Sequence, residues 1–324
     1  MALKKSSTPL KDYILPFLDY CEVEKGLSSN TQRNYDQYLK LFVQWLKKEK
    51  KEKLLPHQLT TDHIWDYRLF LARGHKKKTG EPLSKKSQNY YLIALRAFLS
   101  YLAERDIESL PSSKIKLAKQ KADETISFLT IQDIQAMLKV PDTATKVGLR
   151  DRAIMELFFS SGLRVAELVA LNVDQMSILK DNSTTRTYEL SIVGKGNHIR
   201  TIFISPESAK WLRKYLATRK DVSKPLFINF RSNNPDTNRL TARSIQKMIA
   251  RSALLAGISK KVTPHTLRHT YATDLLDAGA DLRAVQELLG HKNVSTTQIY
   301  THVTNKRLRN IHEKFHGESG KNKK

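Results

Sequence analysis

The sequence has little cysteine and no long apolar run. Cys21 is the single cysteine among 324 residues, which excludes an internal disulfide. No apolar run approaches the roughly 18–20 residues that span a bilayer. The basic residues Lys4 and Lys5 are not followed by the apolar stretch of a secretory signal. We therefore expect a protein of the reducing cytoplasm that does not enter a membrane.

Acidic residues are also few compared with basic ones. The chain has 56 Lys plus Arg against 32 Asp plus Glu, a formal net charge of +24. Residues 1–107 contain 20 basic and 12 acidic residues, a net of +8, so the rest of the chain carries the other +16. Because both halves are basic, the composition favours a long polyanion such as nucleic acid over a small acidic ligand. The alternative is that the charge serves solubility alone.

The length of the chain fits two domains, and the pattern of apolar residues changes between them. Within residues 8–107, apolar residues recur every three or four positions and predict four helices. These helices begin near Leu10, Ser28, Thr60 and Ser84. Eight of the twelve tyrosines lie in this part, and we interpret them as packing residues. Residues 108–125 lose the periodicity and predict a linker.

Cap and stop residues mark further helices in the second domain, which we place at residues 126–316. A helix over 151–159 ends at Gly162, and the cap-proline pair Thr263-Pro264 begins another. A third helix is predicted over residues 282–289, and Gly290 ends it.

Two segments with strand composition flank a glycine-rich turn. Residues 188–193 and 199–204 alternate or are β-branched, and Gly194-Lys195-Gly196-Asn197 between them predicts a hairpin. Residues 226–230 predict a third short strand. The expected fold class is therefore mainly α with a small antiparallel β-sheet, and residues 317–324 are expected to form a disordered basic tail.

Two basic residues stand where they could meet an anion. Arg164 follows Gly162 among apolar neighbours, so it must pair with an acid or bind an anion. Glu167 could pair with it, and a purely structural Arg–Glu pair explains this segment equally well. Lys195 in the hairpin turn could reach into a cleft, although turn lysines are usually just solvated.

A histidine and an arginine share the first turns of the helix that begins at Thr263-Pro264. His265 and Arg268 are three residues apart and lie near the positive end of the helix, where phosphate is favoured. His265 and His269 have the spacing of zinc ligands. However, Thr266 stands where zinc proteases have glutamate, and the chain has no cysteine cluster, so we expect no metal site.

Tyr300 lies nine residues after the tripeptide Leu289-Gly290-His291 and has polar neighbours in the sequence. A phenol has a pKa near ~10 and is a poor nucleophile unless cations assist it. The arginines, the lysine and the histidines named above would supply that assistance. Taken alone, Tyr300 is explained better by packing.

The order of these residues is more specific than any one of them. Gly-Leu-Arg-x-x-Glu, a hairpin lysine, His-x-x-Arg, Leu-Gly-His and a final tyrosine closely resemble the tyrosine recombinase family, above all its Xer-type branch. The strings that carry the resemblance are GLRVAELVAL, GKGNHIRTI, TPHTLRHTYAT, LLGH and STTQIYTHV. Residues 179–186 and 232–238 form longer loops than the family needs, which leaves DNA-contact detail open.

The resemblance implies a C-shaped clamp around DNA. Residues 8–107 would be its SAM-like core-binding domain and residues 126–316 its catalytic domain. Arg164 and Arg268 would bind the non-bridging oxygens of the scissile phosphate, while His265 would hydrogen-bond to that phosphate and accept the proton of Tyr300. The two remaining roles would be bracing of the transition state by His291 and protonation of the 5′-hydroxyl leaving group by Lys195.

The implied activity is site-specific recombination through a covalent 3′-phosphotyrosine and a Holliday junction, without metal, cofactor or ATP. Such an enzyme would act in the cytoplasm on the nucleoid, for example to resolve chromosome or plasmid dimers during segregation. It would work as a tetramer on two DNA sites, held together by a helix at 305–315, with a sister recombinase or a DNA translocase as further partners. The alternative for that helix is packing on its own domain.

Three other functions remain open at this point. A type IB topoisomerase would use the same chemistry to relax DNA, and an integrase of a mobile element would use it for DNA integration. A DNA-binding protein that keeps the fold without catalysis belongs to a different class. The complete set of cationic residues around Tyr300 favours an enzyme.

Overall fold

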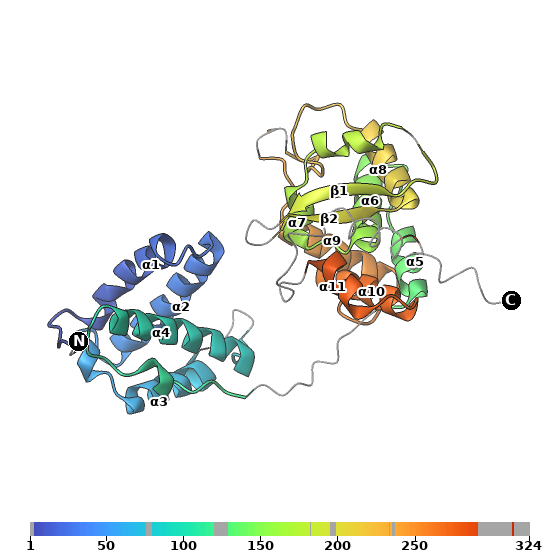
Figure 1. The fold of residues 1–324 in the computed structure, drawn as a ribbon. Coiled ribbons are helices and arrows are strands. Elements are labelled where there is room, and N and C mark those ends of the chain that lie inside the picture. The colour runs from blue at the N-terminus through green and yellow to red at the C-terminus, as the bar shows by residue number, and fades with distance from the viewer. Residues whose placement is uncertain are drawn as a thin grey trace. The chain divides into compact units, whose positions relative to one another are not determined.

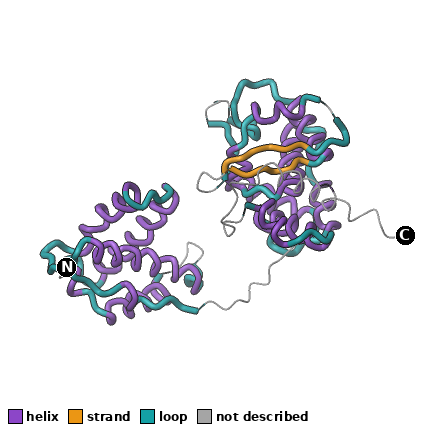
Figure 2. The backbone as a smooth tube through the Cα atoms, viewed as in Figure 1, coloured by secondary structure: helices purple, strands orange, loops and turns teal. Residues whose placement is uncertain are grey.

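The structure, a computed structural model, contains two compact units, residues 1–124 and 125–324. Helices make up most of the described residues of both units, and one pair of strands lies in the second, as Figures 1 and 2 show. The predicted fold class, mainly α with a small antiparallel sheet, is confirmed. The residues described are 3–75, 80–119, 129–181, 183–194, 199–232, 234, 237–290 and 313.

The four helices predicted in the first unit are confirmed. They are α1 (Ile14–Val23), α2 (Ser29–Lys48), α3 (Thr61–Leu69) and α4 (Lys85–Glu104). Thr60 and Ser84 cap α3 and α4 through their side chains, as their residue types favour. Short helical turns at Leu10–Tyr13, Pro56–Gln58, Phe70–Gly74 and Ser112–Lys114 complete the described helical segments of this unit.

Aromatic rings form the centre of the first unit. The ring centroids of Phe42 and Tyr67 are 5.0 Å apart, and those of Trp45 and Tyr67 are 5.3 Å apart. Seven of the eight tyrosines of this unit are buried or packed against its core, and Tyr90 alone is exposed. The interpretation of these tyrosines as packing residues is therefore confirmed for all but Tyr90.

The first part of the expected linker packs against the first unit. Ile115 is buried in its core, and Leu110 and Leu117 pack against that core. The side chain of Asn89 on α4 binds the backbone N–H and C=O of Ala118 at 3.0 and 2.9 Å. Residues 108–119 are thus held by apolar burial and backbone pairing that no periodicity signals.

The second unit contains seven described α-helices. They are α5 (Ile131–Lys139), α6 (Lys146–Ser161), α7 (Val165–Ala170), α8 (Pro206–Ala217), α9 (Ala242–Leu255), α10 (Pro264–Asp277) and α11 (Leu282–Leu289), with a 3-10 segment at Asp174–Leu179. The long helix α6 contacts α8, α10 and the sheet, so it lies at the centre of the core.

The predicted hairpin is confirmed by two antiparallel strands, β1 (Tyr188–Val193) and β2 (Ile199–Ile204). Tyr188, Leu190 and Ile192 alternate inward on β1. The predicted third strand at 226–230 is wrong. Only isolated bridges occur there, Asn172 with Pro225 and Ile228 with Arg239. Single backbone hydrogen bonds to Leu171, Asn238 and Leu240 hold the segment without forming a continuous ladder, and side chains add support.

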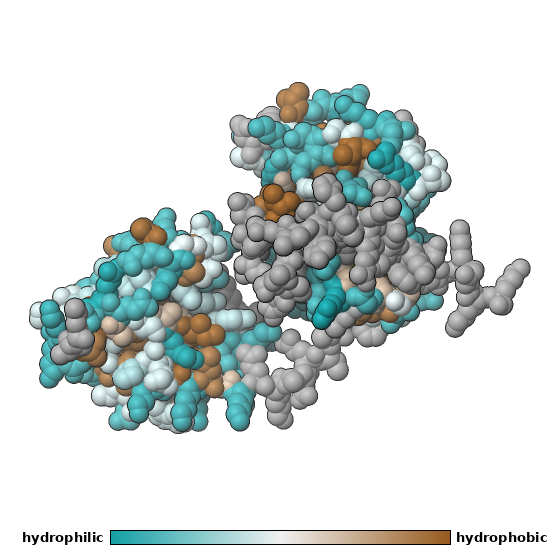
Figure 3. All heavy atoms as spheres, viewed as in Figure 1, coloured by the Kyte–Doolittle hydropathy of each residue, from teal (hydrophilic) through white to brown (hydrophobic). Residues whose placement is uncertain are grey.

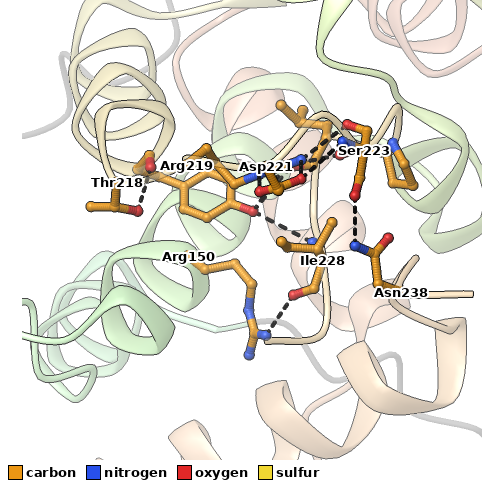
Figure 4. Close-up of polar contacts among 10 residues, drawn as sticks. Arg150, Thr218, Arg219, Asp221, Ser223, Ile228 and Asn238 are labelled. Carbon is orange, nitrogen blue, oxygen red and sulfur yellow. Dashed lines mark hydrogen bonds and ion pairs between the residues drawn. The ribbon is translucent and has the colours of Figure 1, made fainter. Parts of the chain in front are cut away.

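Arg219 provides much of that side-chain support (Figure 4). Its guanidinium donates to the carbonyls of Ser223, Pro225 and Leu226 at 2.8–3.0 Å and pairs with Asp221 at 2.6 Å. The pairing holds the pKa of Asp221 well below its usual range, mainly through the hydrogen bond from Arg219. One buried arginine therefore shapes the loop that follows α8.

The described surface is mostly hydrophilic in the view of Figure 3, with scattered apolar residues. Leu15, Trp65, Val222 and Leu254 are among the exposed large apolar side chains. Within the described ranges, no helix is both long and apolar enough to cross a bilayer.

Candidate active site

Arg164 lies at the N-terminus of α7, directly after the left-handed Gly162 and Leu163. Its backbone N–H donates to Glu167 Oε2 at 2.8 Å, and its side-chain Nη1 donates to Glu167 Oε1 at 2.8 Å. The Arg–Glu pair expected as one alternative is therefore present. The side chain of Arg164 is still 34% exposed, so it has donors left for an external anion.

A second arginine, Arg200 on β2, binds the same carboxylate. Its Nη2 donates to Glu167 Oε2 at 2.8 Å, and its side chain is only 9% exposed. Burial alone would raise the pKa of Glu167, but the hydrogen bonds and charges of Arg200 and Arg164 outweigh it and leave that pKa below its ordinary value. Glu167 is therefore ionised at neutral pH.

Arg268 on α10 is the most deeply buried of the three arginines, at 5% exposure. Its Nη1 donates to the carbonyl of Gly162 at 2.6 Å, and its Nη2 donates to the carbonyl of Leu289. Burial, with repulsion from Arg164 and Arg200, lowers the pKa of Arg268 to about 9. It therefore keeps its charge at neutral pH.

The three arginines meet at the C-terminus of α11. The carbonyls of Leu288, Leu289 and Gly290 accept hydrogen bonds from Arg200, Arg268 and Arg164 respectively. The last carbonyls of a helix lack internal partners and carry partial negative charge, which cations satisfy. The residue after Gly290 is His291, so the arginines hold the backbone at the point where the Leu-Gly-His motif continues.

Positive charge exceeds negative charge in this cluster. Within the described residues, Glu167 is the one carboxylate that hydrogen-bonds to any of the three arginines. Three guanidinium groups and one carboxylate leave a net charge of about +2 in a largely buried place, which is costly unless an anion binds there. The arrangement is thus suited to a phosphate.

His265 has a different environment from Arg268, although both lie on α10. It is exposed in the first turn of the helix, whereas Arg268 points into the cluster. The rings of His265 and His269 stack with centroids 6.4 Å apart. Burial, and less strongly the charge of His265, lowers the pKa of His269, so that ring tends to be neutral near pH 7.

Lys195, His291 and Tyr300 lie outside the described residues, as does the helix expected at 305–315 apart from Glu313. The structure thus brings Arg164 and Arg268 to one cluster and places His265 on the surface of α10. The groups of histidine, cysteine, aspartate and glutamate in the described ranges include none arranged to hold a metal ion.

The described tyrosines of the second unit are all unsuited to attack a phosphate. Tyr188, Tyr215 and Tyr271 are buried in its cores. Burial also raises the pKa of Tyr271 far above the ordinary value of a phenol. Among the four tyrosines of this unit, Tyr300 is therefore the one not assigned to packing.

Arg200 is the site residue that sequence reasoning missed. The inward positions of β1 pair with residues 204, 202 and 200 on β2, so Arg200 lies opposite the buried Ile192. An arginine at an inward strand position needs a buried partner. Both strands were predicted with the observed bounds, but their register, which carries this signal, was not.

The left-handed turn at Gly162 gives a test of the local geometry. Its φ is +59°, and a Cβ there would lie 2.5 Å from Cδ1 of the buried Tyr271 ring. We expect Gly162→Ala to destabilise the protein by about 1–2 kcal/mol through backbone strain and by about 1–3 kcal/mol more through overpacking. Urea unfolding measures the loss.

Gly257→Ala is the matched control for that change. Gly257 has a φ of +77° but nothing within 4 Å of its would-be Cβ. It should therefore lose only the strain contribution of about 1–2 kcal/mol. Equal losses in the two variants would show that Tyr271 and its neighbours do not pack against Gly162 as described.

Two family profiles match the chain. The profile of the phage integrase family matches residues 127–307, and that of the phage integrase N-terminal SAM-like domain matches residues 14–106. The chain is 39% identical over 310 residues to the tyrosine recombinase XerD of Lacticaseibacillus casei, covering 94% of this chain and 98% of that protein. It is 34% identical over 322 residues to the tyrosine recombinase XerC of Leptospira interrogans, covering 98% and 96%.

Solved structures share the fold. A XerH site-specific recombinase bound to its difH substrate aligns with a TM-score of 0.65 at 20% identity, covering 95% of this chain and 97% of that one. A lambda integrase dimer bound to a core site aligns with a TM-score of 0.65 at 18% identity, covering 90% and 100%. The chain therefore belongs to the phage integrase family of tyrosine recombinases, enzymes that cleave and rejoin DNA strands by means of a tyrosine.

Proposed function

We propose that this chain is a site-specific recombinase that cuts duplex DNA by forming a 3′-phosphotyrosine at Tyr300 and exchanges strands through a Holliday junction. The observation that carries the proposal is the cluster of Arg164, Arg200 and Arg268 around the carboxylate of Glu167. Fixed cations in a partly dry site stabilise the extra negative charge of a phosphoryl transition state without reorganising.

Each step of the chemistry balances without a cofactor. The phenol oxygen of Tyr300 bonds to phosphorus as the bond from phosphorus to the 5′ oxygen breaks. The phenol proton passes to His265, whose exposed position at the start of α10 suits contact with a phosphate. Lys195 gives a proton to the leaving 5′ oxygen, and His291 braces the transition state.

The reverse reaction completes the exchange. The 5′-hydroxyl of a partner strand attacks the phosphotyrosine, so the energy of the original phosphodiester is kept and ATP is not needed. Arg164 and Arg268 hold the non-bridging oxygens in both directions and take the part that a metal ion plays in other phosphoryl-transfer enzymes.

Double-stranded DNA is the partner that the charge of +24 favours. In the proposal, residues 8–107 bind one face of the duplex as the core-binding domain. Residues 126–316 bind the other face as the catalytic domain, with 108–125 between them. Relatives and fold neighbours named as Xer recombinases and as recombinases bound to DNA substrates support this partner.

The assembly and cellular role follow from the same proposal. Four copies act on two DNA sites, joined through the helix predicted at 305–315, whose sequence spacing would put Leu308, Ile311, His312 and Phe315 on one face. The enzyme works on the nucleoid in the cytoplasm and resolves chromosome or plasmid dimers. A sister recombinase or a DNA translocase is a further partner.

Two assays on one plasmid test this function. Duplexes recovered from a random-sequence library by binding to the chain supply the target site, and the plasmid carries two copies of it. We expect deletion or inversion of the DNA between the copies. Relaxation of supercoils without any exchange between the sites would favour a type IB topoisomerase instead, and binding without cleavage would favour a non-catalytic DNA-binding protein.

A further inference from the structure

We infer that Arg200 is a positioning residue for the phosphate site, because it joins the strand after the Lys195 turn to both Glu167 and the C-terminus of α11. This inference rests on the proposed function. Arg200 itself takes no chemical step in that function. Its contacts nevertheless connect α7, β2 and α11, the elements next to Arg164, Lys195 and His291 in the sequence.

The first contact orders Arg164. Glu167 Oε2 accepts from the Arg164 backbone N–H at 2.8 Å and from Arg200 Nη2 at 2.8 Å, while Oε1 accepts from Arg164 Nη1 at 2.8 Å. Arg200 therefore fixes the carboxylate through a strand, independently of α7. A carboxylate held at both oxygens can fix the plane of the Arg164 guanidinium.

The second contact orders the chain before His291. Arg200 Nη1 donates to the carbonyl of Leu288 at 2.5 Å. The side chain also lies against the backbone of Gly290, where a Cβ would be 2.5 Å from Arg200 Cδ. The left-handed Gly290, with φ +63°, thus leaves room for Arg200 at the residue just before His291.

The third link is through the strand itself. Arg200 is the second residue of β2, the strand that follows the segment containing Lys195 in the sequence. One side chain, only 9% exposed, therefore ties β2, α7 and α11 together. The buried Nε of Arg200 has no hydrogen-bond partner within the described residues, so packing alone does not explain why an arginine stands there.

The chemistry of arginine suits this role. Its planar fork donates to two acceptors in fixed directions, whereas the ammonium of lysine is a single point of charge. A neutral glutamine would leave Glu167 with one arginine instead of two and would release the Leu288 carbonyl. Small displacements of the groups that hold a reacting phosphate can slow catalysis by about 10²-fold.

The experiment compares Arg200→Gln and Arg200→Lys with the wild-type chain on a nicked duplex that carries the recovered target site. The nick lets a short fragment leave after cleavage, so the covalent adduct accumulates. At saturating DNA, we expect both variants to form the adduct about 10²-fold more slowly. Their dissociation constants for the intact duplex should stay close to that of the wild type, because duplex affinity draws on many phosphate contacts.

Arg213→Gln is the matched control. Arg213 on α8 also joins a carboxylate and a carbonyl, with Asp181 at 3.7 Å and Leu179 O at 2.9 Å, and neither partner is a site residue. This variant should lose stability but cleave at the wild-type rate once the folded fraction is taken into account. A cleavage loss equal to that of Arg200→Gln would reduce Arg200 to a general stabiliser.

A double-mutant cycle with Glu167→Gln tests the route of the effect. If Arg200 acts through Glu167, Arg200→Gln should slow cleavage less in the Glu167→Gln background than in the wild type. Wild-type cleavage by either Arg200 variant, or strictly additive losses in the cycle, would overturn the inference while the proposed function stands. A wild-type chain that forms no adduct would instead count against the proposed function.

Discussion

Replacing Arg268 with lysine is expected to slow formation of the covalent adduct by about 10²–10³-fold and to leave duplex affinity nearly unchanged. Arg268 already holds the carbonyls of Gly162 and Leu289 with two arms of its guanidinium. Its other donors are then fixed in direction and can serve a phosphate oxygen. A lysine at 5% exposure cannot hold both carbonyls and the phosphate at once.

Burial of the substituted lysine adds to the expected loss of cleavage rate. The same environment that lowers the pKa of Arg268 to about 9 would lower that of a lysine as well, from a smaller starting value. The ammonium of the substituted side chain would therefore tend to lose its proton near neutral pH. Affinity should change little because duplex binding draws on many phosphate contacts.

Arg219→Lys is the control for this prediction. Arg219 is also buried and donates to three backbone carbonyls, but its contacts lie in the loop after α8 (Figure 4). It should lower the unfolding midpoint and leave cleavage by the folded protein intact. If Arg268→Lys behaves as Arg219→Lys does, Arg268 stabilises the fold and does not bind the reacting phosphate.

Replacing Tyr300 with phenylalanine should remove the covalent adduct entirely while the chain still binds its target duplex. The change deletes one hydroxyl and keeps the ring, so packing is preserved. The described tyrosines of the second unit are buried and cannot take over the attack. Gel separation of protein from protein–DNA adduct under denaturing conditions measures the effect.

Tyr90→Phe is the matched control for the loss of a hydroxyl. Tyr90 is exposed on α4 and has no role in the proposed chemistry. The variant should form the adduct at the wild-type rate. An adduct that persists in Tyr300→Phe at a comparable rate would mean that another residue is the nucleophile.

Local signals predicted much of the fold. Gly162 and Gly290 end α6 and α11 in the left-handed conformation, and Thr263-Pro264 begins α10 with a side-chain cap and proline in the first turn. These features depend on a few neighbouring residues, so sequence alone reveals them. The helix predicted over 151–159 is nevertheless longer, because Thr145 caps it at Lys146.

Features that depend on distant residues were missed. Residues 226–230 have strand-like composition, but Arg150 and Arg219 bind carbonyls there, and only isolated bridges form. Residues 108–119 have the composition of a linker yet pack on the first unit through Ile115. Long-range partners decide both cases, and no local pattern encodes them.

In the candidate site too, some residues were predicted from local sequence and others depend on distant partners. Arg164, His265 and Arg268 were found from motif order, and the structure adds how differently the three are buried. Glu167 was predicted as a partner of Arg164, but its second partner is supplied by a strand 33 residues away. The role of Arg200 therefore depends on contacts that join β2, α7 and α11, which the structure supplies.

The most direct test of the central claim is the identity of the residue that carries the DNA. The wild-type chain is trapped on the nicked target duplex, both components are digested, and mass spectrometry locates the peptide that retains a nucleotide. The account predicts a single modified peptide with the 3′-phosphate on Tyr300. A nucleotide on any other residue, or a cleaved strand with no attached peptide, would contradict it.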